Sequence, residues 1–396
     1  MSVIGAIMLC LAAGIPLVLL TSGKPPEPTP APEPSQVIER RTVHLPAVFY
    51  TGNLSGPVIN QTQAKTVLQE WWPVSEKALA TNDVSETDAL EEGAAAQYDD
   101  GVTVDNLARK VNLRTIRKYT DTFVFVPKQT SYPAFFVGFV KTTVYPTSPQ
   151  VVKPGTPYIE TLIFLRRNQG SPWKVVLNEG SGAGYPDLPA VDKDGFLTQA
   201  APPKWIDPKA VPPLLASYWQ SWNDLGGAPP GSNFKPGFWT NEFGQRLIDA
   251  TRLDAAQHGH RDSRTFSVDL DRDGFWQFPM KGVEIACFTV RYSKQLTPVS
   301  AASVLTQSRS RADFGGWIAP GTYKSITLQS LQQHCARIGP SEADGIMILG
   351  GNGGPYDGSG VRGAPPKPTP TVTALGPAVP SPTPTPSASA SPGLLP

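Results

Sequence analysis

The prolines of this chain are concentrated near its two ends, and this distribution limits where a packed core can form. Residues 22–36 contain six of the 43 prolines and residues 351–396 contain twelve. Segments this rich in proline lack backbone donors and favour extended, polyproline-type chain. We therefore expect the folded part to lie between them, with a disordered tail rich in Pro, Ser and Thr over residues 351–396.

The middle of the chain has the composition of a globular protein. Hydrophobic residues make up 40% of the sequence, including nine tryptophans, which is enough to build a core. Only 17% of the residues are charged, and Lys+Arg exceeds Asp+Glu by one. A nucleic-acid binder would show a basic face or stripe. The charge balance therefore predicts no nucleic-acid partner.

An uninterrupted apolar run occupies residues 3–20. Eighteen such residues are near the lower limit for crossing a hydrocarbon layer about 30 Å thick. The run is longer than the apolar part of a cleaved signal peptide, although small residues that would suit cleavage follow it. We expect residues 1–23 to be a transmembrane anchor or signal-anchor, so that the membrane is a partner through residues 3–20, and residues 24–59 to be a proline-rich spacer and lead-in.

The orientation in the membrane is predicted from opposing signals. Lys24, Arg40 and Arg41 follow the apolar run and no basic residue precedes it, which by the positive-inside rule favours a cytoplasmic body. The stiff proline-rich spacer and the Ser/Thr/Pro-rich tail are instead typical of an exported protein held away from a surface. We expect a single-pass cell-membrane protein whose body is extracytoplasmic.

The first half of the middle region changes from helical to strand-like periodicity. Apolar residues recur at helical spacing from Gln61 onward, and Val104, Leu107 and Ala108 repeat that spacing in a later helix. Short aromatic and β-branched runs bounded by turn residues then predict antiparallel strands at 122–127, 133–140, 158–167 and 172–178.

The same order recurs in the second half. A helix is expected from Val211, where two prolines suit a helix start, and another from about Thr240. Strands are expected at about 264–271, 274–280, 283–292, 323–337 and 343–349. The sequence therefore predicts an α+β protein of two tandem domains, each with N-terminal helices packed on a curved antiparallel sheet. The expected bounds are 60–180 for the first domain, 181–210 for a linker and 211–350 for the second domain.

The three cysteines do not have the spacing of a zinc site. Cys10 lies in the apolar run, which leaves Cys287 and Cys335 in the folded part. In an exported protein these two could form a disulfide, and closing a loop of 48 residues would stabilise the fold by about 4 kcal/mol. Two separate buried thiols are the alternative.

One acidic motif resembles the start of a calcium-binding loop. Asp269, Asp271 and Asp273 alternate before Gly274, but Met280 occupies the position where such a loop has a glutamate. The flanking residues are strand-like, so we interpret Asp273-Gly274 as a hairpin turn and keep the calcium site only as an alternative. Residues His258 and His260 are interpreted as part of a polar loop. We therefore expect no metal site.

The catalytic and phosphate-binding motifs that can be recognised in a sequence are missing. The chain has no Gly-x-Ser-x-Gly elbow and no phosphate-binding loop ending in Gly-Lys-Ser/Thr. We therefore assign no catalytic and no cofactor-binding residues.

The order of helices and strands resembles the cone fold of nuclear transport factor two and ketosteroid isomerase. More closely, the middle is similar to an uncharacterised family of actinobacterial exported lipoproteins and membrane proteins. The resemblance is carried by residues 126–137, 162–175, 188–196 and 211–219. It implies export and tandem cone-fold domains, but no reaction, substrate or cofactor. Members of that family are anchored by a lipidated cysteine, which this chain lacks.

Two functional hypotheses follow. The first is a membrane-anchored, non-catalytic binding or scaffolding module of the cell envelope, with an unknown ligand or protein partner. The second is a small-molecule enzyme of the isomerase or hydratase type. Cone folds can hold an acidic base and a tyrosine donor between the sheet and the helices. Four residues are the candidates for such polar groups: Asp121, Tyr119, Tyr132 and Tyr218.

Overall fold

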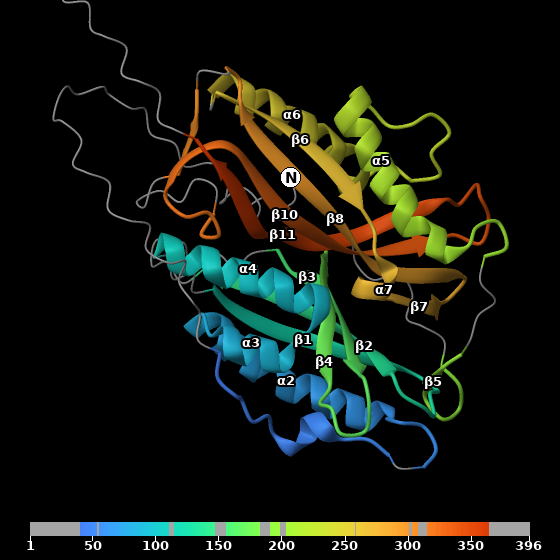
Figure 1. The fold of residues 1–396 in the computed structure, drawn as a ribbon. Helices are drawn as coiled ribbons and strands as arrows, with labels where there is room; N and C mark the ends of the chain where they lie inside the picture. The colour runs from blue at the N-terminus through green and yellow to red at the C-terminus, as the bar shows by residue number, and fades with distance from the viewer. Residues whose placement is uncertain are drawn as a thin grey trace, which may run out of the picture.

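The computed structural model describes residues 40–53, 55–110, 115–146, 156–182, 191–198, 203–257, 259–300, 303–307 and 315–363. They form two units in which helices precede strands, which confirms the predicted α+β class (Figure 1). The expected membrane anchor at residues 3–20 lies outside these ranges. Among the helices described, none is long and apolar enough to cross a membrane.

The first unit places its helices on one face of an antiparallel meander. Its helical elements are η1 (Ala47–Tyr50), α2 (Gln61–Thr81), α3 (Val84–Leu90) and α4 (Gly93–Arg109). Its strands are β1 (Thr115–Pro127), β2 (Ala134–Pro146), β3 (Tyr158–Arg166), β4 (Lys174–Ser181) and the short β5 (Phe196–Leu197). The strand order is β4-β3-β2-β1-β5, and β5 pairs with β1 in parallel.

Local capping fixes where the helices of the first unit begin. The Asn60 side chain accepts a hydrogen bond from the Gln63 backbone, and the Gln63 side chain accepts one in return from the Asn60 backbone. This capping box satisfies two backbone donors at the start of α2. The Asp83 carboxylate does the same for α3 by accepting from the backbones of Ser85 and Glu86.

The second unit repeats this order with a larger sheet. Its helical elements are η2 (Pro208–Ala210), α5 (Val211–Leu225), the π-helical turn η3 (Phe238–Glu242), α6 (Phe243–Gln257) and α7 (Leu270–Asp273). Its strands are β6 (His260–Ser267), β7 (Phe275–Met280), β8 (Val283–Pro298), β9 (Leu305–Gln307), β10 (Gly321–Ile338) and β11 (Ile346–Arg362). The order is β11-β10-β8-β6, with β7 added on β8 and β9 on β10.

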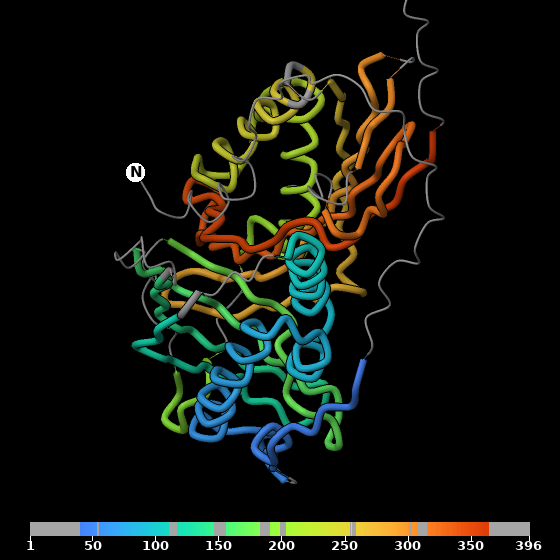
Figure 2. Tube along the Cα trace, turned by 90° about the vertical axis from the view of Figure 1, so that its left-hand side faces the viewer, coloured from blue at the N-terminus to red at the C-terminus, as the bar shows by residue number. Residues whose placement is uncertain are grey.

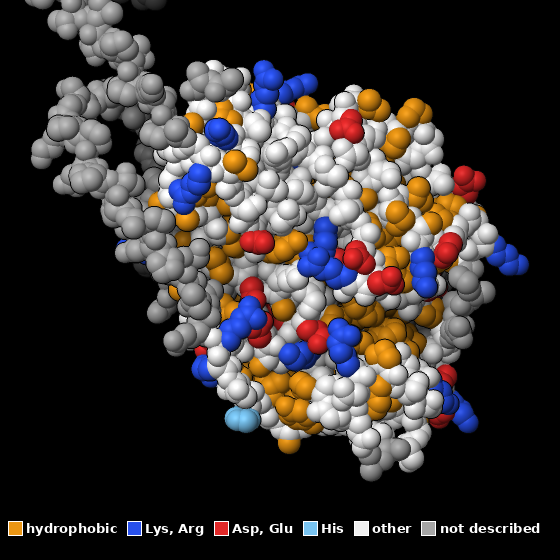
Figure 3. All heavy atoms as spheres, viewed as in Figure 1, with side chains coloured by type: hydrophobic (Ala, Val, Ile, Leu, Met, Phe, Trp, Pro, Cys, Tyr) orange, Lys and Arg blue, Asp and Glu red, His pale blue; other side chains and the backbone are white. Residues whose placement is uncertain are grey.

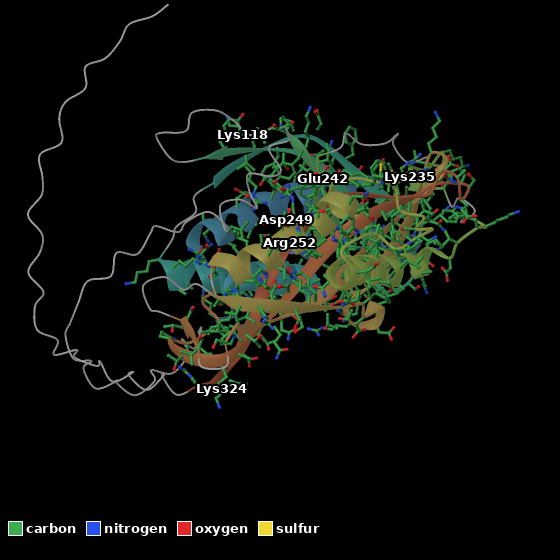
Figure 4. The ribbon with its side chains drawn as sticks, turned by 90° about the horizontal axis from the view of Figure 1, so that it is seen from above. Lys118, Lys235, Glu242, Asp249, Arg252 and Lys324 are labelled. Atoms are coloured by element: carbon green, nitrogen blue, oxygen red, sulfur yellow. A yellow bond between two sulfur atoms is a disulfide. The ribbon has the colours of Figure 1, made fainter. Side chains whose placement is uncertain are left out.

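Hydrophobic side chains form a core inside each unit and a third core between the units. In the first unit, Trp71, Phe136 and Phe164 pack between helices and sheet. In the second unit, Trp219 packs in the core between helices and sheet. Helix α6 of this unit, which carries Asp249 and Arg252 (Figure 4), lies on the face of the sheet that is turned away from the first unit. The third core joins side chains of both sheets and includes Phe125, Phe139, Ile163, Leu177, Trp276, Phe278 and Ile285. The two sheets therefore pack against each other, and Figures 1 and 2 show α4 lying against β11.

Three expected domain boundaries need correction. The lead-in before residue 60 is part of the first domain, because Phe49 of η1 is completely buried in its core. The linker over 181–210 contributes β5 to the first sheet. The tail does not begin at residue 351, because β11 continues to Arg362.

The glycines after residue 349 lie in β11 and not in the expected tail, and close packing explains why. A Cβ atom on Gly350 would lie 1.9 Å from Glu179 Oε1, and one on Gly353 would lie 2.1 Å from the Leu331 carbonyl. Neighbouring chain occupies the space that side chains would need, so the strand can only form with glycine at these positions.

The acidic motif at 269–274 forms neither a hairpin turn nor a calcium loop. Residue Asp269 caps the one-turn helix α7 by accepting from the Arg272 backbone. The buried Asp273 carboxylate binds Arg291, with contacts of 2.6 and 2.5 Å. The hairpin interpretation is wrong because β6 and β7 do not pair with each other and instead follow one another along β8.

No group of three or more His, Cys, Asp or Glu side chains within the described ranges is placed to hold a metal ion. His260 is buried on β6, and His258 lies outside the described residues.

Residues Cys287 and Cys335 form a disulfide between directly opposed positions of β8 and β10. Both cysteines are buried in the core between the two sheets. The disulfide thus joins the central strands of the second sheet on the face that meets the first domain.

Candidate functional site

The helix-facing surface of the first sheet is apolar at one end and polar at the other. On β3 the residues that face the helices are, in order, Tyr158, Glu160, Leu162 and Phe164. The phenylalanine stacks on Phe136 of β2 and meets Trp71 of α2 edge to face. At the other end of the same row, Tyr158 lies opposite Thr142 of β2, and Glu160 places a carboxyl group on the surface beside it.

A β-bulge brings two further polar residues to this surface. Asp121 has a φ of 51° and is the extra residue between Thr120 and Thr122 in the pairing of β1 with β2. One extra residue reverses the alternation of side chains along a strand. Residues separated by an odd number of positions normally lie on opposite faces of a strand. Because of the bulge, Arg117 and Tyr119 instead face the helices, on the same face as the buried Val124 and Val126.

These residues meet acidic groups from the helices in what we call the Arg117 cluster. It consists of seven side chains from α2, the α3–α4 connection, α4, β1 and β3: Glu76, Glu91, Asp99, Arg117, Tyr119, Tyr158 and Glu160.

The arginine lies between two carboxylates at the centre of the cluster. Arg117 Nε is 3.4 Å from Glu76 Oε1, and its Nη1 is 3.4 Å from Glu160 Oε1. The Tyr119 hydroxyl donates to Glu76 Oε1 at 2.7 Å, and the Tyr158 hydroxyl donates to Glu160 Oε1 at 2.6 Å. Burial opposes the charge of the guanidinium, but these carboxylates and tyrosines raise the pKa of Arg117 well above its ordinary value.

A second acidic pair lies on the helix side of the arginine. Burial, together with the neighbouring Asp99, raises the pKa of Glu91 well above its ordinary value, and burial also raises the pKa of Asp99. Burial of these two neighbouring carboxyl groups favours the protonated, uncharged form of each. Burial raises the pKa of the adjacent Tyr98 to about 12, so that its hydroxyl stays protonated.

The cluster has a buried floor and a partly exposed rim. Residues Glu160 and Glu91 are 2% and 3% exposed, whereas the side chains of Arg117 and Glu76 are 23% and 26% exposed. Burial also raises the pKa of Glu160, against the opposing effect of Arg117. Solvent therefore reaches the cluster from the side of Arg117 and Glu76.

Some polar atoms around the cluster have no hydrogen-bond partner in the described part of the chain. They are Glu91 Oε2, Thr142 Oγ1 and Trp72 Nε1. Thr142 is completely buried and lies opposite both Tyr119 and Tyr158 in the sheet register. A buried polar atom without a partner costs roughly 1–3 kcal/mol. These atoms can each bond a polar group that enters the cluster.

Of the four polar residues expected from the sequence, the structure places only Tyr119 in the cluster. The bulge turns Asp121 outward, where its carboxylate is 3.7 Å from Lys141. The ring of Tyr132 packs against Arg166 at the apolar end of the first core. The Tyr218 hydroxyl belongs to the second domain and donates to Asn241 at 2.7 Å.

The corresponding space in the second domain is filled by aromatic rings. The buried His334 ring lies among Trp219, Trp239 and Phe288. Its Nδ1 is 2.8 Å from the Gly350 carbonyl, and burial lowers the pKa of His334 to about 4, so the ring is neutral. This packing is that of an aromatic core.

Sequence inspection missed most of the cluster, although one signal was available. In β3, Glu160 shares the two-residue period of the core residues Leu162 and Phe164, and a charged residue at a core position indicates a functional or ion-paired site. The carboxylates of Glu76 on α2 and Glu91 after α3 carry no such signal, because an acidic residue in or beside a helix is ordinarily exposed to solvent.

Charged side chains outside the cluster show no single sign on the visible face. Figure 3 shows Lys and Arg interspersed with Asp and Glu among the described residues of this face. A mixed surface of this kind does not create the extended field that steers a large charged polymer.

A family model described as a domain of unknown function (DUF8094) matches residues 55–237. The matched range contains the first helix-and-sheet unit from α2 to β5, including every residue of the Arg117 cluster, and extends through α5 of the second unit. None of the curated proteins matches the chain.

Proposed function

We propose that this protein is a membrane-anchored, extracytoplasmic binding module and that a small ligand binds at the Arg117 cluster. One observation supports this proposal most strongly. At the Arg117 cluster, more carboxyl groups than basic groups lie together with buried polar atoms that have no hydrogen-bond partner, beside a rim that is partly exposed to solvent. Binding sites typically combine apolar walls with a few convergent polar groups of this kind.

Stability alone does not account for the cluster. Burying the carboxyl groups of Glu91 and Glu160 costs free energy that one arginine, which also faces Glu76, does not fully offset. Apolar residues of similar volume would serve a core at least as well. The other end of the same sheet surface, around Phe136 and Phe164, is built in that apolar way. A ligand that supplies the missing contacts explains why the polar end differs.

The way the chain enters the first domain supports an anchored arrangement. Arg40 pairs with Asp88 and Asp100, at 3.0 Å each. The next residue, Arg41, pairs with Asp83 and Glu86 on α3, at 2.5 and 3.0 Å. The proline-rich spacer would therefore leave the folded body beside α3 and α4, and the connection between these helices and α4 itself carry part of the cluster.

Ligand capture followed by mass spectrometry tests the binding proposal. The wild-type protein, a Glu91→Gln variant and a Glu92→Gln control are each incubated with an extract of envelope small molecules. Glu92 is the sequence neighbour of Glu91, but its carboxylate lies 2.9 Å from Arg167 outside the cluster. We expect a compound that is retained by the wild type and the control and lost in Glu91→Gln. Equal retention by all three proteins, or by none, would overturn the proposal.

A topology reporter tests the proposed location. Because β11 extends to Arg362, the reporter must be fused after residue 363 to leave the sheet intact. We expect a reporter that works only after export to be active, and a reporter active only in the cytoplasm would contradict the extracytoplasmic assignment.

An isomerase or hydratase is the second candidate, favoured by the hydrogen bond from the Tyr158 hydroxyl to a buried glutamate, Glu160. A tyrosine donor beside a carboxyl group of raised pKa is the combination that acid–base chemistry uses. The captured compound distinguishes the two functions. Recovery of the compound unchanged after prolonged incubation indicates binding, whereas conversion to an isomer or a hydrated product that requires Glu160 indicates catalysis.

A further inference from the structure

We infer that the ligand of the Arg117 cluster is an organic cation, a small molecule carrying an ammonium group. This inference rests on the proposed function, because it names the class of compound that the same site would take. It is argued from the charge balance of the cluster, the aromatic rings around it and the hydrogen-bonding character of its atoms without partners.

The charge balance favours a positive ligand. The cluster holds four carboxyl groups and one guanidinium. The acidic groups of the cluster therefore outnumber its one basic group. A buried excess of negative charge is costly unless a cation compensates it. An anionic ligand would add to the excess and an uncharged ligand would leave it unchanged.

Aromatic rings beside the carboxylates distinguish an organic cation from a metal ion. The ring of Trp72 meets Tyr119 edge to face, and Tyr158 lies on the same surface. Faces of such rings attract ammonium groups by about 0.5–2 kcal/mol each. Within the described ranges, no three metal-ligating side chains converge, so an ammonium group suits the arrangement better than a bare metal ion.

The hydrogen-bonding atoms without partners also suit an ammonium group. Primary ammonium groups only donate hydrogen bonds. The cluster offers Glu91 Oε2 as an acceptor and Thr142 Oγ1 as an acceptor or donor. Both residues are buried to at least nine-tenths, and the hydroxyl lies opposite the two tyrosines of the cluster.

Cation binding at this place should depend on pH. The charged groups that face Glu91 are Asp99 and Asp100 of α4 and Arg117 of β1. An ammonium group beside Glu91 would favour the ionised form of its carboxyl group, against the effect of burial. Affinity should therefore increase as the pH rises through the range in which Glu91 ionises.

Matched pairs of probes test the inference by isothermal titration calorimetry on the folded wild-type protein. Choline is compared with neohexanol, its uncharged carbon isostere, and putrescine with the diol of the same chain length. We expect at least one ammonium compound to bind at least about tenfold more tightly than its uncharged partner, a difference of ~1.4 kcal/mol. This preference should disappear in Glu91→Gln and weaken in Thr142→Val, and the Glu92→Gln control should retain it.

Three outcomes would overturn the ligand class: equal binding of a probe and its isostere, no binding of either ammonium compound, or ammonium binding that persists in Glu91→Gln. The capture experiment keeps this failure separate from failure of the proposed function. If the compound captured through the cluster is anionic or uncharged, the binding module stands and the cationic ligand does not.

Discussion

Arg117 holds the acidic groups of the first domain together. Its guanidinium lies between Glu76 and Glu160, and it also lowers the pKa values of Glu91 and Asp99 against the effect of burial. Removing the positive charge leaves four carboxyl groups facing one another in a partly dry environment. The side chain is therefore required for the fold of the cluster as well as for the shape of the proposed site.

We expect Arg117→Met to lower the free energy of unfolding by about 3 kcal/mol, the cost of removing one member of a buried charge network. Urea denaturation measures the change. Lys118→Gln is the matched control, because its side chain is exposed on the same strand (Figure 4) and should change the stability little. Equal effects of the two substitutions would show that Arg117 is not buried among charges.

The buried carboxyl group of Glu179, at the interface between the sheets, should make stability depend on pH. Burial raises the pKa of Glu179 from 4.5 to about 8. Between these values the native state holds a proton that the unfolded chain releases. The free energy of unfolding should therefore fall as the pH rises from about 4.5 to about 8.

We expect Glu179→Gln to flatten this pH dependence, because the amide stays neutral throughout the range. Denaturation curves at several pH values compare it with the wild type and with Glu342→Gln, whose side chain is exposed. A variant as sensitive to pH as the wild type would mean that Glu179 is not the responsible group.

At the scale of elements, local sequence signals predicted most helices and strands, and tertiary contacts account for the differences. The bulge at Asp121 could not be foreseen, because the extra residue is defined only by pairing with β2. Helix α4 shows the same limit. Val104 and Leu107 keep helical spacing but are not buried, whereas Thr103 and Asp105 are. The reason is that α4 packs between the Arg117 cluster and β11, so polar residues occupy its inner faces.

Close packing of α4 on β11 predicts an unusual effect of a helical glycine. An alanine in place of glycine inside a helix normally stabilises it by about 1 kcal/mol. At Gly101 the added Cβ would lie 2.6 Å from Tyr356 Cα and 3.0 Å from the Pro355 carbonyl, both in the backbone of β11. We expect Gly101→Ala to destabilise the protein by roughly 1–3 kcal/mol in thermal or urea unfolding.

Gly227→Ala is the control, because a Cβ there meets no atom within 4 Å. Stabilisation by Gly101→Ala would contradict the packing of α4 against the second sheet.

At the scale of the whole molecule, two helix-and-sheet units pack through their sheets. The order of helical and strand periodicities was enough to predict two α+β units. It could not predict their association, because Phe139, Ile163 and Phe278 look like ordinary core residues of their own units and form a joint core only in the assembled chain. Strand β11 could not be predicted in full either. Its glycines are typical of a linker, and the sequence does not show the neighbouring strands that pack against them.

The disulfide should stabilise both units together. The bond between Cys287 and Cys335 closes a loop of 48 residues and lies in the joint core. We expect the Cys287→Ala, Cys335→Ala double variant to lose about 2–4 kcal/mol of unfolding free energy. Calorimetry should show one transition at a lower temperature, matched by the reduced wild type. Two separate transitions in the oxidised wild type would contradict the joint core.

Ligand binding at the Arg117 cluster of the first domain can be seen directly in a crystal structure of the protein with the compound recovered in the capture experiment. We expect the compound beside Arg117, with a positively charged group within hydrogen-bond distance of Glu91 and near Thr142. The same compound bound at any other place, with the cluster unchanged, would contradict this expectation.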